Sequence, residues 1–254
     1  MKNQFVETGS IVRKIWGKSD TLLFIFAGAA AEFALNKAVD WLYFTGRLPA
    51  DPLGRLFSTV AYARKIIFSE QEEALKAIDQ ITGIHKAVEK SRSLQIPGWA
   101  YLDVLFLLIG YSISSFELLE RKLTKEEKEE VFDVFYRVGV RMQLENLPAS
   151  FEEWTVMRQN NLKTNLINSE FTADLYIQYK KHLGFLRYQL LQQVQLVLVP
   201  EQVKKLLLPG KVCWISPILL SYKILRAIKL EKPFKNALLP ATYKKQINEL
   251  DGEG

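Results

Sequence analysis

Few residues in this sequence of 254 are suited to metal chemistry: two histidines, His85 and His182, and a single cysteine, Cys213. The histidines lie far apart along the chain, so they form no local zinc or non-haem iron motif. One imidazole is nevertheless enough to ligate a haem iron from the proximal side. The haem then carries the chemistry, while the protein supplies the axial ligand, an apolar slot for the ring and cations for the propionates.

His85 falls on the repeat of a predicted helix. Its apolar face recurs at steps of four and three residues through Ala74, Ile78, Ile81, His85 and Val88. This is the period of an amphipathic α-helix, and the motif SEQE at Ser69 predicts a capping box at its start. The pattern places His85 on the buried face, where an imidazole needs a hydrogen-bond partner or a metal. The residues alone leave open a core histidine or a ligand, whereas His182, in YKKHLGF, is typical of an exposed or interfacial residue.

A second helix is predicted directly before this one. Asp51 and Pro52 are a strong helix start, with the aspartate as N-cap and the proline at the first helical position. Arg55, Thr59 and Tyr62 follow at i, i+4 and i+7, so they share one stripe of the helix. A stripe with a cation and two hydroxyl groups is able to line a polar pocket or to form an ordinary solvent face. The available cations around both helices are Arg55, Arg64, Lys65 and Lys86.

Several catalytic motifs are absent from the sequence. It contains no Walker A motif, no GxGxxG, no GxSxG and no HExxH. It also lacks the Glu-x-x-His pair typical of di-iron helical bundles. These absences argue against P-loop, dinucleotide-binding, α/β-hydrolase and zincin chemistry.

The rest of the chain is also predicted to be helical. One helix is expected from Ser19 through Phe44, and its small residues 27–31 let another helix or a flat ligand approach closely. Further helices are expected over 99–123, from Thr124, from Ser150 and from Ser169, the last split at Gly184, with a loop at 160–168. No stretch alternates with a period of two, so we expect little or no sheet. The sequence therefore predicts a single all-α domain of about ten helices.

Composition and charge bear on where the protein acts. The apolar fraction is 48% and the net charge is +6. Between Val203 and Lys245 the sequence contains ten Lys or Arg residues but only one acidic residue, Glu231. This basic end is either a peripheral contact with anionic lipid or a solvated face. No signal peptide, membrane span or nucleic-acid motif is recognised, and the single cysteine excludes an internal disulfide. We expect a cytoplasmic protein, with membrane association at the basic end as one interpretation.

Longer segments resemble a known family. The sequences ADPLGRLFSTVAYARKIIFSEQEEA, IHKAVE, WAYLDVLFLLIGYSISSFELLERKLTKEEKEE, YRVGVRM and LPASFEEW are similar, in this order, to the ER-bound oxygenase mpaB / rubber oxygenase catalytic domain family. The latex-clearing proteins belong to that family. The similarity extends from about Trp16 to Lys211, followed by a basic helical extension over 212–254. The resemblance implies an all-α, globin-related fold that encloses haem b. It also implies an enzyme that uses dioxygen on long apolar, isoprenoid-like substrates.

The resemblance also implies roles for individual residues. It makes His85 the iron ligand and places Arg55 and Thr59 near the distal pocket. The sequence departs from the family at Ser58, where latex-clearing proteins have a lysine, and at Glu89, where an arginine often follows the haem histidine. The first helix also lacks the His-Pro of many bacterial relatives, so a distal base, if one is needed, would be Glu32 or Asp40.

Three hypotheses follow from these observations. The first is a haem-b-dependent oxygenase that uses O₂ on a hydrophobic, isoprenoid-like substrate, with His85 as ligand and Arg55 and Thr59 as nearby polar groups. The second is a protein that binds haem or another apolar ligand without oxygenase activity, which the altered distal positions motivate. The third is a helical, peripheral-membrane protein without a cofactor, which the basic C-terminal third motivates.

Overall fold

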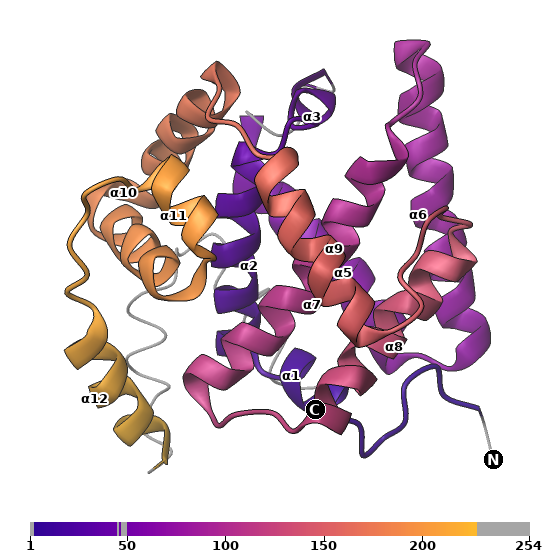
Figure 1. Ribbon diagram of the computed structural model, residues 1–254, viewed down its shortest axis with the longest axis horizontal. Coiled ribbons are helices and arrows are strands. Elements are labelled where there is room, and N and C mark those ends of the chain that lie inside the picture. Colours follow the sequence, from indigo (N-terminus) through magenta and orange to yellow (C-terminus); the bar gives the residue numbers. More distant parts are fainter. Residues whose placement is uncertain (1–2, 45, 47–49, 228–254) are drawn as a thin grey trace.

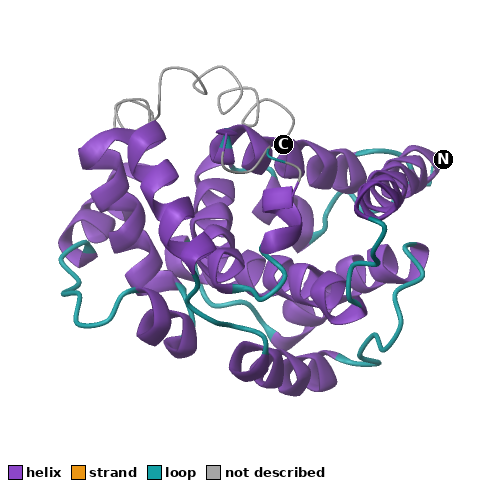
Figure 2. Ribbon diagram, turned by 90° about the horizontal axis from the view of Figure 1, so that it is seen from above, coloured by secondary structure: helices purple, strands orange, loops and turns teal. Residues whose placement is uncertain are grey.

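The protein's structure, a computed structural model, describes residues 3–44, 46 and 50–227, except for the side chains of 55–57 and 227. The regular secondary structure of this part is entirely helical, as predicted. The described residues contain no strand, only two isolated β-bridges, Gln4–Glu70 and Asn36–Leu166. Figure 2 shows helices and loops throughout. The helices are α1 (Ile11–Trp16), α2 (Ser19–Leu35), α3 (Asp40–Phe44), α5 (Pro52–Phe68), α6 (Gln71–Arg92), α7 (Gly98–Leu119), α8 (Lys125–Arg141), α9 (Phe151–Thr164), α10 (Glu170–Leu198), α11 (Glu201–Leu207) and α12 (Ser216–Ala227).

The core is built around α2 and α7. Figure 1 shows α2 near the centre, with α10 to α12 on one side and α6 and α8 on the other. Gly28 in α2 permits close packing, because a Cβ there would lie 2.3 Å from the Tyr111 ring in α7. The run of small residues in α2 therefore accommodates a neighbouring helix at Gly28.

A buried ion pair joins α2 to α9 through this core. The guanidinium of Arg158 donates to both carboxylate oxygens of Glu32, at 2.5 and 2.6 Å, and the Tyr111 hydroxyl donates to the same carboxylate at 2.8 Å. All three side chains are buried. Burial and the nearby Glu32 raise the pKa of the Tyr111 hydroxyl well above its usual value. Tyr111 therefore remains a hydrogen-bond donor.

A second buried carboxylate, Asp103 of α7, is surrounded by amides. Asn36 and Asn165 each donate to one of its oxygens at 2.9 Å, and Asn161 donates to the other at 2.7 Å. Burial raises the pKa of Asp103, although the three hydrogen bonds act in the opposite direction. The cluster joins α7 to the end of α2 and the end of α9.

This cluster explains two errors in the predicted helix boundaries. The helix expected to reach Phe44 ends at Leu35, because Asn36 adopts an extended backbone. Its buried side chain donates to Asp103 and accepts a hydrogen bond from the Ala38 N–H at 2.8 Å. The loop predicted over 160–168 is helical up to Thr164. Two of its polar residues, Asn161 and Asn165, point toward the buried carboxylate of Asp103, whereas Asn160, Lys163 and Thr164 are exposed.

Most predicted helix starts are confirmed. Asp51, Thr124, Ser150 and Ser169 each accept a hydrogen bond from a backbone N–H of the first turn. The capping box predicted at Ser69 is wrong by one residue, since α6 has Glu70 as its N-cap and Ser69 ends α5.

Among the described residues, α7 alone has the length and apolarity of a membrane span, and 67% of its apolar window is buried in the protein. Such burial is typical of a central core helix. The short helix α1 was not predicted.

Candidate functional site

The candidate site lies at one end of the α5–α6 hairpin. Residues Ser69 and Glu70 connect the two helices. An α-helix rises about 1.5 Å per residue, so His85 lies about 20 Å along α6 from this connection, and the first turn of α5 lies about as far along its own axis. His85 and the start of α5 are therefore both remote from the connection.

His85 is only half-buried, which corrects the prediction of a continuously buried face. Ala74 and Ile78, one and two turns into α6, are fully buried, whereas Ile81, His85 and Val88 are partly exposed. The reason is that the far half of α6 extends beyond the main core. Nδ1 of His85 is nevertheless shielded from solvent.

Tyr101, in the first turns of α7, lies against His85. The two ring centroids are 5.1 Å apart and the ring planes meet at 68°, an edge-on arrangement. The Tyr101 hydroxyl donates to Oε1 of Glu89 at 3.1 Å, and the backbone N–H of Ile96 donates to the same oxygen at 2.9 Å. Burial and the Glu89 carboxylate raise the pKa of Tyr101 far above its usual value. Tyr101 therefore stays protonated and keeps donating.

An ion pair ties α6 to α3 at the same end of the hairpin. Arg92 Nη2 donates to Asp40 Oδ2 at 2.6 Å, and its guanidinium lies over the Trp41 ring, 4.2 Å from the centroid. Asp40, one candidate for a distal base, is thus held by a cation. Its carboxylate serves to join α3 and α6 in this structure.

The other candidate base, Glu32, lies in a different layer of the protein. It bonds Tyr111, which is ten residues after Tyr101 in α7. Ten helical residues correspond to about 15 Å along the axis. The structure thus holds Glu32 in the ion pair with Arg158 and does not bring it beside His85 and Tyr101.

The polar stripe predicted on α5 is described only in part. Thr59 and Tyr62 are half-buried, and Ser58 is exposed. Arg55 belongs to the first turns of α5, but its side chain lies outside the described residues. The role predicted for Arg55 therefore stays a prediction.

Among the cations near the hairpin, Arg64 contributes to packing inside the protein. It is buried, donates to the carbonyl of Trp16 at 2.8 Å and lies over the Phe68 ring at 4.8 Å. Lys65 and Lys86 are exposed, so they remain accessible to an anionic group. His182 is exposed too, as predicted.

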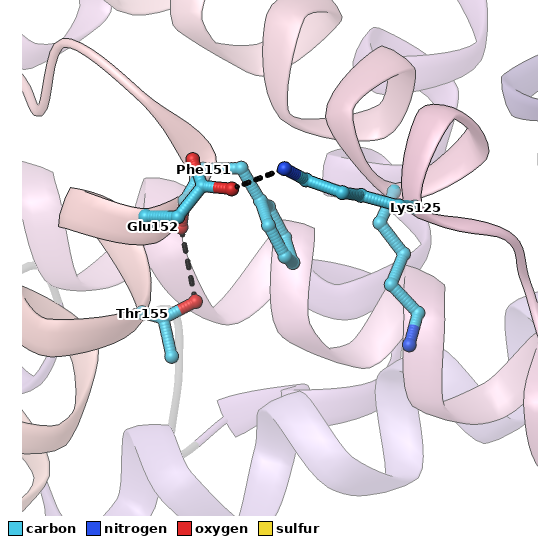
Figure 3. A pocket seen from close by; sticks show the side chains of 5 residues that line it. Lys125, Phe151, Glu152 and Thr155 are labelled. Carbon is cyan, nitrogen blue, oxygen red and sulfur yellow. Dashed lines mark hydrogen bonds and ion pairs between the residues drawn. The ribbon is translucent and has the colours of Figure 1, made fainter.

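The described residues contain no group of three or more His, Cys, Asp or Glu that is suited to a bare metal ion. A shallow hollow of about 460 Å³ lies between the starts of α8 and α9 (Figure 3). Its Lys125 ammonium pairs with Glu152 at 2.9 Å, and the Thr155 hydroxyl donates to the Phe151 carbonyl. Because these groups satisfy one another, the hollow resembles an ordinary surface depression.

Sequence reasoning did not identify Tyr101 or Arg92 as part of the site. Their positions depend on how α7 and α3 pack against α6, which no local pattern encodes. Glu89 was noticed only as a departure from the family. Its position four residues after His85, on the same side of the helix, is the signal that links the two.

Comparison with known proteins identifies the relationship. The family model for the catalytic domain of the ER-bound oxygenase mpaB/B′/Rubber oxygenase matches residues 13–226. The match reaches α12, further than the expected limit at Lys211. Searches of curated proteins and of solved structures return no match. Since the family model covers most of the sequence, this chain belongs to the mpaB/rubber oxygenase catalytic domain family.

Proposed function

We propose that the protein is a haem-b-dependent oxygenase that uses O₂ on a hydrophobic, isoprenoid-like substrate, with His85 as the residue that would hold the haem iron. Membership of an oxygenase family supports the reaction class. His85 is assigned as the iron ligand because of its surroundings. Its imidazole is half-buried, its Nδ1 atom is shielded from solvent, and the Tyr101 ring packs against it.

The donor set fits haem better than it fits a bare ion. A lone histidine is a poor site for a free metal ion, and the described residues offer no larger cluster of ligands. Haem brings four nitrogen ligands of its own and needs one axial group from the protein. His85 is such a group, so the residues present are consistent with this cofactor.

The chain's own residues would orient and enclose the cofactor. Haem, when bound, supplies the iron and its dioxygen chemistry. His85 would hold the iron, while Tyr101 and Glu89 fix the start of α7 beside it. Lys65 and Lys86 would offer exposed cations to the propionates. Thr59, and Arg55 as implied by the family, would provide polar groups on α5.

The flanking side chains suit an apolar ring and substrate. Ile81 and Val88 are half-buried on the same face of α6 as His85, and Ile84 is 45% exposed beside it. These three residues together give His85 apolar surroundings, which are typical of the lining of a site for an apolar ligand. This supports a hydrophobic substrate class without selecting a particular molecule.

A second function is a haem or apolar-ligand carrier without oxygenase activity. The observation that favours it is Glu89, which replaces the family's arginine and is already engaged by Tyr101 and Ile96. Ser58, where latex-clearing proteins have lysine, is exposed on α5. A carrier would retain the proximal side and dispense with distal chemistry.

The ligand assignment is tested by the visible spectrum of protein expressed with haem supplied. The wild type and His182→Ala should show a Soret band of equal intensity per protein, whereas His85→Ala should lose it or show it shifted. His182→Ala is the matched control because His182 is exposed on another helix. A Soret band that is missing from the wild type, or unchanged in His85→Ala, would contradict the assignment.

Oxygen consumption then separates the enzyme from the carrier. Haem-loaded protein is mixed with a polyprenyl lipid, and dissolved oxygen and cleaved products are followed. Consumption that depends on both the lipid and His85 supports the oxygenase. Loaded protein that consumes no oxygen with polyisoprenoid, polyprenyl or prenylated aromatic lipids supports the carrier.

A further inference from the structure

The kink in α10 exposes two large apolar side chains at a corner of the protein. Gly184 has φ 72° and ψ 171°, which interrupts the helix at the predicted position. A positive φ favours glycine, so the break is encoded in the sequence. Directly after it, Phe185 and Leu186 are 69% and 73% exposed.

The segment before α12 continues this apolar surface. Lys211 Nζ donates to the Gln192 side chain at 2.7 Å, and the Gln193 amide donates to the Val212 carbonyl at 3.1 Å and accepts from the Trp214 N–H at 2.8 Å. These bonds fix the segment along the second half of α10. Val212 is nevertheless 78% exposed and Trp214 is 47% exposed.

The outer face of α12 is apolar as well. Leu219 and Tyr222 are buried and point into the protein. Leu220 and Ile224, four residues apart on the opposite side, are 62% and 57% exposed. The solvent face of a helix usually carries charged or polar residues at such positions.

These three parts lie on the same side of the protein. Leu186 and Leu190 are four residues apart, so they share one stripe of α10. Leu190 packs against the cluster that contains Ile215 and Leu219 at the start of α12. Figure 1 accordingly shows α10 and α12 along one side of the molecule. The exposed apolar residues of this side, here named the apolar ridge, are Phe185, Leu186, Val212, Trp214, Leu220 and Ile224.

The charge around the apolar ridge is strongly positive. One acid, Glu201, lies between residues 180 and 226, against eight basic residues: Lys180, Lys181, Arg187, Lys204, Lys205, Lys211, Lys223 and Arg226. Arg226 pairs with Asp20 and Glu120. Lys180, Lys181 and Lys211 are exposed. This excess of cations is complementary to a surface of anionic lipid phosphates.

We propose that the apolar ridge binds the surface of an anionic lipid bilayer. The large apolar side chains enter the boundary between headgroups and acyl chains, and the lysines contact the lipid phosphates. Tryptophan is favoured at this depth of a membrane, and exposed apolar residues beside cations are the usual composition of an interfacial helix. The proposal concerns binding alone and is independent of the cofactor.

The test is co-sedimentation of the full chain with two kinds of vesicle: phosphatidylcholine alone, and phosphatidylcholine with phosphatidylserine. The wild type should bind the anionic vesicles at low salt and be released by high salt. The double variant Phe185→Ser/Leu186→Ser should lose roughly tenfold or more in partitioning, because binding scales with inserted apolar area. Lys180→Glu/Lys181→Glu should lose the preference for anionic lipid.

The matched control is Val140→Ser/Val156→Ser. These valines are 51% and 61% exposed on α8 and α9, away from the apolar ridge. The control should bind vesicles like the wild type, and circular dichroism checks that every variant is folded. Equal binding by the Phe185/Leu186 variant and the wild type would overturn the proposal. So would a wild-type dimer that binds neither vesicle and becomes a monomer in that variant, since the ridge would then be a protein interface.

Discussion

The ring of Tyr101 lies edge-on to the imidazole of His85, with centroids 5.1 Å apart, while its hydroxyl donates to Glu89 one turn further along α6. One residue of α7 therefore restrains both the candidate ligand and its neighbouring carboxylate. The chain thus positions His85 by tertiary packing as well as by helical period.

Replacing Tyr101 separates the contribution of its ring from that of its hydroxyl. Tyr101→Phe keeps the edge-on contact and removes one hydrogen bond, so it should reduce the free energy of unfolding by about 1 kcal/mol and leave haem affinity nearly unchanged. Tyr101→Ala also frees the imidazole and should weaken haem binding several-fold. Haem titration followed at the Soret band, together with urea denaturation, measures both effects. Equal loss of haem affinity in the two variants would argue against a role for the ring.

The fold was largely predictable because many of its signals are local. The helix starts at Thr124, Ser150 and Ser169 and the break at Gly184 follow from caps and backbone freedom. The end of α2 at Asn36 could not be predicted, because it depends on a hydrogen bond to Asp103, distant in sequence. The all-α class is confirmed, whereas the relation to globins stays a prediction.

The candidate site was less predictable than the fold. The helical period located His85 on the apolar side of α6, but it could not show that this half of the helix extends beyond the main core. Similarly, Glu32 and Asp40 were plausible bases in sequence. Their partners, Arg158 and Arg92, come from other helices and became visible only in three dimensions.

The buried pair of Glu32 and Arg158 gives a prediction for stability. Glu32→Gln leaves the Arg158 cation buried without its counter-charge and should cost about 3–5 kcal/mol of unfolding free energy. The double variant Glu32→Gln/Arg158→Met removes both charges, keeps an amide oxygen that can accept from the Tyr111 hydroxyl, and should recover much of that loss. Urea denaturation of Glu32→Gln, Arg158→Met and the double variant measures the coupling.

A solvent-exposed pair supplies the control for this cycle. Arg141 binds both oxygens of Asp79, at 2.8 and 2.6 Å, with both side chains roughly half exposed to solvent. Because solvent screens such a pair, Asp79→Asn should have a much smaller effect than Glu32→Gln. Similar losses at the two sites would show that burial is not what makes the core pair important.

The close approach of α2 and α7 at Gly28 gives a third prediction. An added methyl group would lie 2.3 Å from a ring carbon of Tyr111, and that ring is buried and held by Glu32. Gly28→Ala should therefore destabilise the protein by about 1–3 kcal/mol. Gly83→Ala is the control, because a Cβ there meets no atom within 4 Å in the middle of α6. It should stabilise the protein by up to about 1 kcal/mol, since alanine favours helix.

The start of α8 predicts a specific dependence on pH. Glu127 accepts two hydrogen bonds from Arg121, both at 2.7 Å, and one from the backbone N–H of Thr124 at 2.9 Å. The Arg121 guanidinium, followed by the Thr124 N–H, lowers the pKa of Glu127 from 4.5 to about 2. A pKa that is lower in the folded state stabilises the protein fully above the unfolded value, and this contribution disappears as pH falls.

Comparison with Glu127→Gln isolates this carboxylate. The wild type should exceed the variant in unfolding free energy by a constant amount above about pH 5. The difference should then shrink as the pH falls from 4.5 toward about 2, where the folded-state carboxylate also takes up a proton. Ser169→Ala is the control: it removes the hydroxyl that caps α10, at 3.4 Å from the Thr172 N–H, and should cost about 1 kcal/mol at every pH. A group whose pKa differs between the folded and unfolded states must make the free energy of unfolding depend on pH. If the difference in unfolding free energy between the wild type and Glu127→Gln does not change with pH, the charge of Glu127 therefore contributes nothing to stability.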